Sequence, residues 1–323
     1  MNRYIGHEHQ IYGVEEMRLV GGKGDGMRLF QVRNGNGLEF TVSADRGADI
    51  SRLSFGGDNF GYFAPCGYVA PAYYDCQGVG FLKSFTAGFL TTCGLSSVGT
   101  PCTDAGEELP LHGTVANTPA EHISHWIEQD TIHIKARVRD AAMFNHGLIL
   151  EREFLVPLFG NTLEIIDRVT NIGVDETPLQ MLYHFNVGYP LLDETTKLLI
   201  PTEEVTPRTE HAATGIATCL QMETPQRGYE EMCFYHKMSG EAHVTVFNPN
   251  LGKGFVMSYD TAELPYFTEW KMMGERDYVL GVEPANTLPD GRDLMRKNGL
   301  LETLKVGESK THHLKFEFIY SEE

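Results

Sequence analysis

Residues 132–139 read Ile132-His133-Ile134-Lys135-Ala136-Arg137-Val138-Arg139, and this stretch decides the fold class. Apolar and basic side chains alternate along it, which is the period of a β-strand with one buried face. Other apolar runs of about strand length lie on both sides of it, separated by turn-forming residues. They cover residues 148–156, 163–169, 179–185, 243–247, 254–259, 278–282 and 314–320. Only residues 293–298 suggest a helix, and it is short.

The N-terminal part shows the strand pattern as a hairpin. Residues 27–32 alternate, Asn34-Gly35-Asn36-Gly37 is a strong hairpin turn because Asn and Gly tolerate positive φ, and residues 38–42 return. Residues 56–106 are irregular and rich in glycine and aromatic residues, a composition typical of functional loops. Many strands and almost no helix predict an all-β protein, a large antiparallel sandwich forming a single domain over residues 1–323.

Composition narrows the choice of partner and compartment. The net charge of −18 argues against nucleic acid and anionic membranes, because both require a basic face. The N-terminus has no apolar region typical of a secretory signal, and no apolar run is long enough to span a membrane. The six cysteines contain no CxxC pair and are expected to be reduced thiols. We therefore expect a cytoplasmic protein with no nucleic-acid or membrane partner; the net charge says nothing about a neutral small-molecule substrate, and the sequence leaves a homodimer open.

Three polar side chains interrupt apolar runs in the same way. The run at residues 278–283 ends in Glu283, which is costly to bury unless it is paired or used in chemistry. His112 follows an apolar approach and meets Gly113, and His184 lies inside an aromatic strand. Alone, Glu283 could equally be a structural ion pair, and each histidine is more often an ordinary core residue. If their strands converge, the three would form an acid–base site that works at neutral pH.

Other candidates are weaker. Arg46, in the charged stretch Asp45-Arg46-Gly47-Ala48-Asp49-Ile50, fits a substrate clamp and a solvated loop equally well. Trp270, flanked by Glu269 and Lys271, could stack on a sugar or be a core residue. No metal site is predicted, because the pair His122 and His125 has no third ligand nearby.

Five short motifs occur in the order known from one family and span roughly residues 40–290. They are Ala44-Asp45-Arg46-Gly47-Ala48-Asp49-Ile50, Thr92-Cys93-Gly94-Leu95, Leu111-His112-Gly113, Tyr183-His184-Phe185-Asn186-Val187-Gly188 and Gly281-Val282-Glu283-Pro284. The chain thus resembles the aldose 1-epimerases, or galactose mutarotase-like proteins, and within them the uncharacterised DUF4432 branch. Each motif is weakly specific, and the ordered set is fairly specific.

The resemblance implies a β-supersandwich with an open concave face that holds a carbohydrate. It implies that His184 is the general acid, that Glu283 is the general base, and that His112, with Asn186 of the same motif as His184, binds the sugar. Glu283 would take the proton of the anomeric hydroxyl while His184 protonates the ring oxygen. The ring would open to the aldehyde, rotate about C1–C2 and close as the other anomer, without a metal or organic cofactor.

The chain also departs from the family. Well-studied mutarotases carry a sugar-binding Arg where this chain reads Thr91-Thr92-Cys93-Gly94-Leu95, and Arg46 and Lys271 are our candidate replacements. In place of a sugar-binding Asp between the second His and the Glu, the chain offers Glu230, Glu231 and His236, of which we take Glu231 as the candidate ligand. The sugar, an aldose or a derivative, is not identified. Two alternatives are a non-catalytic carbohydrate-binding or sugar-sensing protein, and a lyase or hydrolase, which the lack of an obvious nucleophile disfavours.

Overall fold

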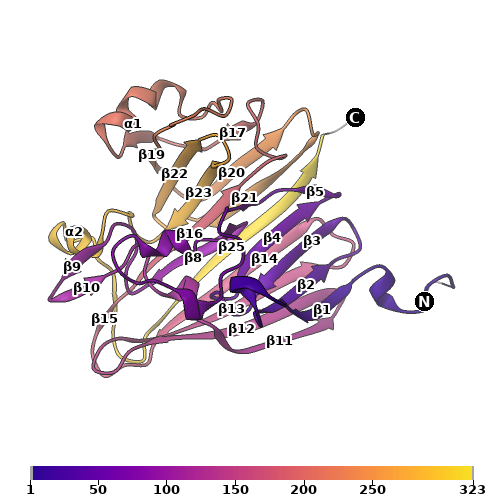
Figure 1. The fold of residues 1–323 in the computed structure, drawn as a ribbon, viewed down its shortest axis with the longest axis horizontal. Helices are drawn as coiled ribbons and strands as arrows, with labels where there is room; N and C mark the ends of the chain where they lie inside the picture. Colours follow the sequence, from indigo (N-terminus) through magenta and orange to yellow (C-terminus); the bar gives the residue numbers. More distant parts are fainter. Residues whose placement is uncertain (1–2, 322–323) are drawn as a thin grey trace.

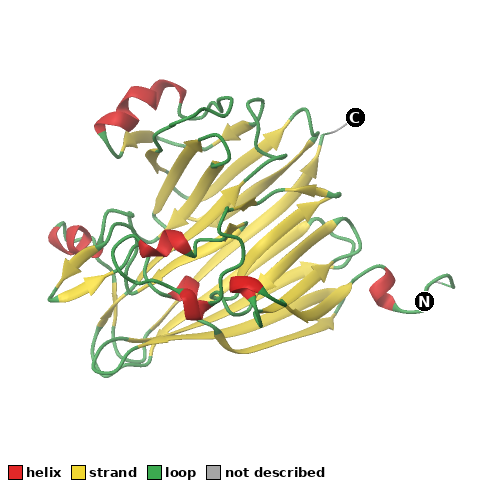
Figure 2. Ribbon diagram, viewed as in Figure 1, coloured by secondary structure: helices red, strands yellow, loops and turns green. Residues whose placement is uncertain are grey.

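A computed structural model describes residues 3–321, and antiparallel strands dominate it (Figures 1 and 2). Residues 1–2 and 322–323, the ends of the predicted domain, lie outside the described residues. A five-stranded sheet has the order β1 (Gly13–Arg18), β2 (Arg28–Arg33), β3 (Leu38–Ser43), β4 (Asp49–Phe55), β5 (Asp58–Asn59).

Two larger sheets complete the main architecture. An eight-stranded sheet has the order β11 (Ala120–Glu128), β12 (Thr131–Ala141), β13 (Gly147–Pro157), β14 (Thr162–Asn171), β25 (Ser309–Tyr320), β21 (Lys253–Asp260), β20 (Glu241–Asn248), β17 (Lys197–Leu199). A six-stranded sheet has the order β18 (Glu204–Pro207), β19 (Met232–Lys237), β22 (Tyr266–Met273), β23 (Tyr278–Ala285), β16 (Gln180–Val187), β8 (Leu90–Leu95). The predicted large antiparallel sandwich is confirmed.

The remaining elements are short and peripheral. Three two-stranded pairs join β6 (Tyr62–Phe63) to β7 (Ala87–Gly88), β9 (Cys102–Asp104) to β10 (Glu107–Leu109), and β15 (Thr177–Pro178) to β24 (Thr303–Leu304). Residues 3–321 contain two α-helices, α1 (Glu210–Gly215) and α2 (Arg292–Lys297), the second at the predicted position. No helix among residues 3–321 has the length and apolarity needed to cross a membrane.

One apolar core lies between the eight-stranded sheet and the two smaller sheets. Its aromatic contacts cross the layers: Phe40 of β3 lies 6.1 Å from Phe154 of β13, and Phe185 of β16 lies 4.8 Å from Phe316 of β25, between ring centroids. On β12 the buried apolar positions are Ile132, Ile134, Ala136 and Val138, as the alternation in the sequence predicts. Side chains alternate along a strand, so the neighbours of the core-facing residues in the six-stranded sheet point away from the core.

The irregular segment between β5 and β8 lies over the outer face of the six-stranded sheet. It contains two 3₁₀ turns, η3 (Pro71–Tyr73) and η4 (Gly80–Lys83). Its backbone is tied to β10 and the following loop, where the amide of Leu111 donates to the carbonyl of Gly78 at 3.1 Å. The segment thereby forms a wall beside β16.

Candidate active site

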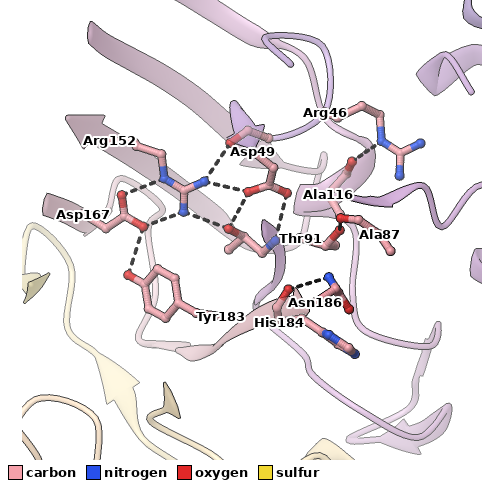
Figure 3. Close-up of polar contacts among 12 residues, drawn as sticks. Arg46, Asp49, Ala87, Thr91, Ala116, Arg152, Asp167, Tyr183, His184 and Asn186 are labelled. Carbon is pink, nitrogen blue, oxygen red and sulfur yellow. Dashed lines mark hydrogen bonds and ion pairs between the residues drawn. The ribbon is translucent and has the colours of Figure 1, made fainter. Parts of the chain in front are cut away.

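Strand alternation divides the side chains of the six-stranded sheet between the core and the outer face. On β16, Tyr183 and Phe185 enter the core, so the intervening His184 points to the outer face. On β23, Leu280 and Val282 enter the core, so Glu283 points outward. Figure 3 shows Tyr183 and His184 leaving the strand on opposite sides.

The cross-strand register places the outward side chains in one row. Tyr235 of β19 pairs with Thr268 of β22, Thr268 pairs with Glu283 of β23, and His184 of β16 pairs with Thr91 of β8. His184 and Glu283 close the row, since His184 Nε2 lies 3.3 Å from Glu283 Oε1. Cross-strand neighbours on one face are in direct contact, so the row places an acid and a base side by side.

The row forms part of a cavity of about 390 Å³ on the outer face. Its lining includes His112, His184 and Glu283, together with Glu231 and Trp270. The structure thus brings together five of the eight residues singled out in the sequence. The other lining residues are Val79, Phe81, Leu82, Phe85, Gly99, Thr100, Pro101, Leu111, Arg208, Cys233, Thr268 and Pro289.

Burial shifts the two central groups in opposite directions. It raises the pKa of the Glu283 carboxyl well above its ordinary value, and the charge of Glu231 adds to this rise. It lowers the pKa of the His184 imidazole well below its ordinary value, and His112 adds to this fall. In the free protein both groups therefore favour their neutral forms, with the carboxyl of Glu283 protonated and the ring of His184 not.

His112 completes an aromatic cluster around His184. Its ring centroid lies 5.7 Å from that of His184, and Trp270 packs on the other side at 5.2 Å. His112 has a positive φ of 58°, and the next residue, Gly113, has a φ of 72°. A Cβ on Gly113 would lie 2.3 Å from the carbonyl oxygen of Gly94, so glycine is needed for this close approach. Burial, with the charge of Arg208, lowers the pKa of His112 to about 4, so its ring is neutral at neutral pH.

Several polar atoms of the cavity residues have no hydrogen-bond partner among the described residues. They are His112 Nδ1, His184 Nδ1, Thr268 Oγ1 and Glu283 Oε1, and all four are buried. Buried polar atoms in proteins are nearly always hydrogen-bonded, and exceptions concentrate at sites that bind a ligand or perform chemistry. Their position in one cavity indicates a site that receives a polar molecule.

Gly281 provides the space for Glu283. Both residues face outward on β23, and a Cβ at position 281 would lie 2.2 Å from Glu283 Oε1 and 2.9 Å from the Cβ of Trp270. Any side chain at this position would displace the carboxylate or the indole. The glycine in the motif Gly281-Val282-Glu283-Pro284 therefore has a steric reason.

At one end of the cavity, Trp270 and Glu231 hold each other in place. Trp270 Nε1 donates to Glu231 Oε2 at 2.7 Å. The indole is consequently held beside His184, and the carboxylate keeps its other oxygen for a ligand.

The cation of the cavity is Arg208, which the sequence analysis missed. Its Nε donates to Asp290 Oδ1 at 3.0 Å, and its Nη2 donates to Thr100 Oγ1 at 2.8 Å. Tyr235 donates to the same oxygen of Asp290 at 2.6 Å. Arg208 follows the edge strand β18 in a segment without apolar periodicity, so no sequence pattern marked it.

Arg46, a predicted substrate-binding residue, does not line the cavity. It is 6 % exposed, and its Nε donates to the carbonyl of Ala116 at 2.6 Å (Figure 3). Its Nη1 donates to the carbonyl of Val69 at 2.8 Å. The guanidinium thus satisfies loop carbonyls. The prediction that Arg46 replaces the family's sugar-binding cation is wrong on this geometry.

Lys271 and Asn186 also lie outside the cavity lining. Lys271 alternates with Trp270 on β22 and points to the opposite face, where its Nζ donates to the carbonyl of Gln221 at 2.5 Å and to Glu223 Oε1 at 3.0 Å. Asn186 is fully buried, and its Nδ2 donates to the carbonyl of His184 at 2.7 Å (Figure 3). Neither is placed to contact a ligand in this cavity, and Asn186 supports the backbone of β16 next to His184.

Comparison with known proteins gives the same fold. A crystal structure of a proposed aldose 1-epimerase from Klebsiella pneumoniae subsp. pneumoniae MGH 78578 matches with a TM-score of 0.91 and 26% identity, over 96% of this chain and 84% of that one. A galactose mutarotase-like protein from Clostridium acetobutylicum matches with a TM-score of 0.68 and 15% identity, over 96% and 99%. A galactose 1-epimerase from Lactobacillus acidophilus NCFM matches with a TM-score of 0.63 and 12% identity, over 96% and 100%.

A search of curated proteins finds no match to this chain. The model of one family, described as a domain of unknown function, DUF4432, matches residues 24–318, which is most of the chain. The chain therefore belongs to the DUF4432 family, and its fold is that of the galactose mutarotase-like proteins.

Proposed function

We propose that this protein interconverts the anomers of a reducing sugar by acid–base catalysis at His184 and Glu283. The observation that carries the proposal is the contact between the two side chains, 3.3 Å apart and both buried in the wall of one cavity. The fold shared with proteins named aldose 1-epimerases supports the reaction class. Anomer exchange requires only a proton donor and a proton acceptor at adjacent atoms of one sugar, and this pair supplies both.

The pair carries one proton in either of two arrangements. In the neutral arrangement Glu283 is protonated and His184 is not, which is the state that burial favours. In the ionic arrangement Glu283 is a carboxylate and His184 an imidazolium. Transfer of one proton across the 3.3 Å contact converts one into the other, and hydrogen bonds from bound sugar hydroxyls stabilise the charged arrangement.

Ring opening starts from the ionic arrangement. The Glu283 carboxylate takes the proton of the anomeric hydroxyl, the C1–O5 bond breaks, and His184 gives its proton to O5. The products are the open aldehyde and the neutral pair, which burial favours. After rotation about C1–C2, O5 attacks the other face of C1, Glu283 returns a proton to O1, and His184 takes the proton of O5.

The neighbouring side chains have the roles that their free atoms allow. His112 Nδ1 and Thr268 Oγ1 are buried with no partner in the described part of the chain and are positioned to bind sugar hydroxyls. Trp270, 5.2 Å from His184, offers an aromatic face to the apolar face of the ring. Arg208 and Glu231 bound the cavity on the side of β18 and β19 and can bind further hydroxyls.

The test is anomer exchange, measured by NMR saturation transfer with the purified protein over a panel of reducing sugars. We expect at least one sugar to exchange faster than in buffer, and Glu283→Gln to lower that enhancement by about 10²–10⁴-fold. The sheet offers a matched control in Glu269→Gln. Glu269 is also buried beside a histidine, His236, at 3.0 Å, but it faces the core.

Four outcomes would decide the proposal. Exchange that falls in Glu283→Gln and persists in Glu269→Gln supports it. A panel with no accelerated sugar overturns it, as does an enhancement that both variants keep. A sugar that binds, seen as line broadening of its resonances, yet exchanges no faster than in buffer indicates the carbohydrate-binding alternative.

A further inference from the structure

The cavity has a polar side and an apolar side, and the acid–base pair lies between them. On the β18 and β19 side are Arg208 and Glu231. On the β16 side is an apolar wall formed by Val79, Phe81, Leu82, Phe85 and Leu111, whose side chains contain no polar atom. A sugar with hydroxyl groups all round would leave some of them against this wall without a hydrogen-bond partner.

The wall is in contact with His184. The ring centroid of Phe85 lies 5.3 Å from that of His184, and Phe81 lies 5.2 Å from Phe85. His112 packs on Phe81 at 5.4 Å as well as on His184, so it lies beside the ring-oxygen position rather than beyond the wall. The residue assigned to protonate the ring oxygen therefore borders the apolar wall directly.

The order of the atoms in a pyranose ring predicts which part of the substrate lies against this wall. The ring oxygen is bonded to C1 on one side and to C5 on the other. If Glu283 contacts O1 and His184 contacts O5, then C5 and its substituent continue beyond His184, toward Phe85 and Phe81. The hydroxyls at C2 and C3 lie on the other side of C1, toward Thr268 and Glu231.

We infer that the substrate carries an apolar group at C5, as a 6-deoxyhexose does, and this inference rests on the proposed function and its assignment of His184 to the ring oxygen. The methyl group of such a sugar would pack against Phe81 and Phe85. A hydroxymethyl group would place a hydroxyl against the same rings, and the carboxylate of a hexuronic acid would place a charge there.

The test compares matched sugars that differ only at C6. The pairs are D-fucose with D-galactose, L-fucose with L-galactose, L-rhamnose with L-mannose, and D-quinovose with D-glucose; D-galacturonic acid is added. Saturation transfer gives kcat/KM for each. We expect at least one 6-deoxy sugar to exceed its parent hexose by about tenfold or more, the size of effect that one small group has in an apolar pocket. We expect the uronic acid to be slower than both.

The two possible failures are distinguishable. If no sugar of the panel exchanges faster than in buffer, the proposed function fails and the inference fails with it. If sugars do exchange but every parent hexose matches or exceeds its 6-deoxy partner, the inference is overturned and the proposed function stands.

A variant at the mouth of the wall tests the location of the C5 group. Leu82 is 57% exposed, so Leu82→Asn should fold, and we expect it to reduce the preference for the 6-deoxy sugar several-fold. Leu199→Asn is the control, because Leu199 is 61% exposed and lies on β17 of the other large sheet. An unchanged preference in Leu82→Asn, equal to that in Leu199→Asn, would overturn the assignment of the C5 group to the wall.

Discussion

Two buried glutamate–histidine pairs lie in the same six-stranded sheet on opposite faces, and only one of them lines a cavity. His184 and Glu283 face outward, 3.3 Å apart, with no hydrogen bond between them. His236 and Glu269 face the core, and His236 Nε2 and Glu269 Oε2 form a hydrogen bond at 3.0 Å. The residue types and burial are nearly the same. The two pairs differ in the face of the sheet that they occupy. On the outer face, His184 and Glu283 are available to a ligand; on the core face, His236 and Glu269 are packed inside the protein.

On the core side, buried polar groups are paired by hydrogen bonds. Arg152 of β13 is fully buried and bonds Asp167 at 2.9 and 2.6 Å and Asp49 at 2.6 Å (Figure 3). Tyr183, the residue before His184, donates to Asp167 at 2.9 Å. On β16, the bonded core position of Tyr183 is thus followed by the outward position of His184, whose Nδ1 has no partner among the described residues.

The largest loss of stability should come from removing a buried, fully bonded charge on the core side. Arg152→Met would leave Asp49 and Asp167 buried without their cation, and we expect the free energy of unfolding to fall by about 3–5 kcal/mol. Urea unfolding followed by fluorescence measures this, with the m-value as a check on two-state behaviour. Arg168→Met on β14 is the matched control, because Arg168 is exposed and bonds only Ser309, at 3.1 Å. Equal losses in the two variants would contradict the structural role of Arg152.

A smaller loss should follow from breaking the core pair. His236→Leu leaves Glu269 buried without its hydrogen-bond partner, and we expect a loss of about 1–3 kcal/mol. His184→Leu removes a ring whose Nδ1 has no hydrogen-bond partner among the described residues, so stability should change less, although anomer exchange should be lost. Urea unfolding of the two variants measures both losses. A larger loss of stability in His184→Leu than in His236→Leu would contradict the assignment of the structural role to the core pair.

The sequence was sufficient to predict the fold class and to single out five residues that line one cavity. Alternation, turn signals and scarce helical periodicity are local properties, and they predicted the antiparallel sandwich. The same alternation places Trp270 on the opposite face from Glu269 and Lys271, so it could have excluded Lys271 and drawn attention to Thr268. It could not say which face would carry a cavity, because that depends on the loop at residues 79–85 packing across β16.

Strand alternation could not predict which arginine lines the cavity. Arg46 stands in a charged stretch, yet it satisfies the carbonyls of Ala116 and Val69, contacts that join segments far apart in the sequence. Arg208 reaches the cavity because its backbone amide pairs with the carbonyl of Cys233 beyond the edge strand β18. Long-range pairings of this kind leave no periodic pattern in the sequence. The density of charges around Arg46 therefore suggested a cavity residue, whereas Arg208 is the arginine that lines the cavity.

The smallest effect, and opposite in sign, is expected at Glu283. Burial raises the pKa of its carboxyl in the folded state above its ordinary value of 4.5. Below pH 4.5 the group is protonated in both states; as the pH rises, the unfolded chain loses this proton first, so stability falls until the raised folded pKa is reached. Gln cannot ionise. Glu283→Gln should therefore be more stable than the wild type at pH 7, by about 0.5–2 kcal/mol, while it loses activity.

The pH dependence distinguishes this cause from a general gain in packing. The advantage of Glu283→Gln should be smallest near pH 4 and grow as the pH rises, as measured by urea unfolding at several pH values. The lowered pKa of His184 weakens the fold at acid pH, but His184 is present in both proteins and largely cancels in the difference. Glu317→Gln, at an exposed position of β25, should show no such trend. An advantage of Glu283→Gln that is the same at every pH, or a loss of stability at pH 7, would mean that the carboxyl is stabilised where it lies. The contrast between the two pairs would then fail, because the outward glutamate would contribute to stability although it lacks the hydrogen bond that Glu269 makes with His236.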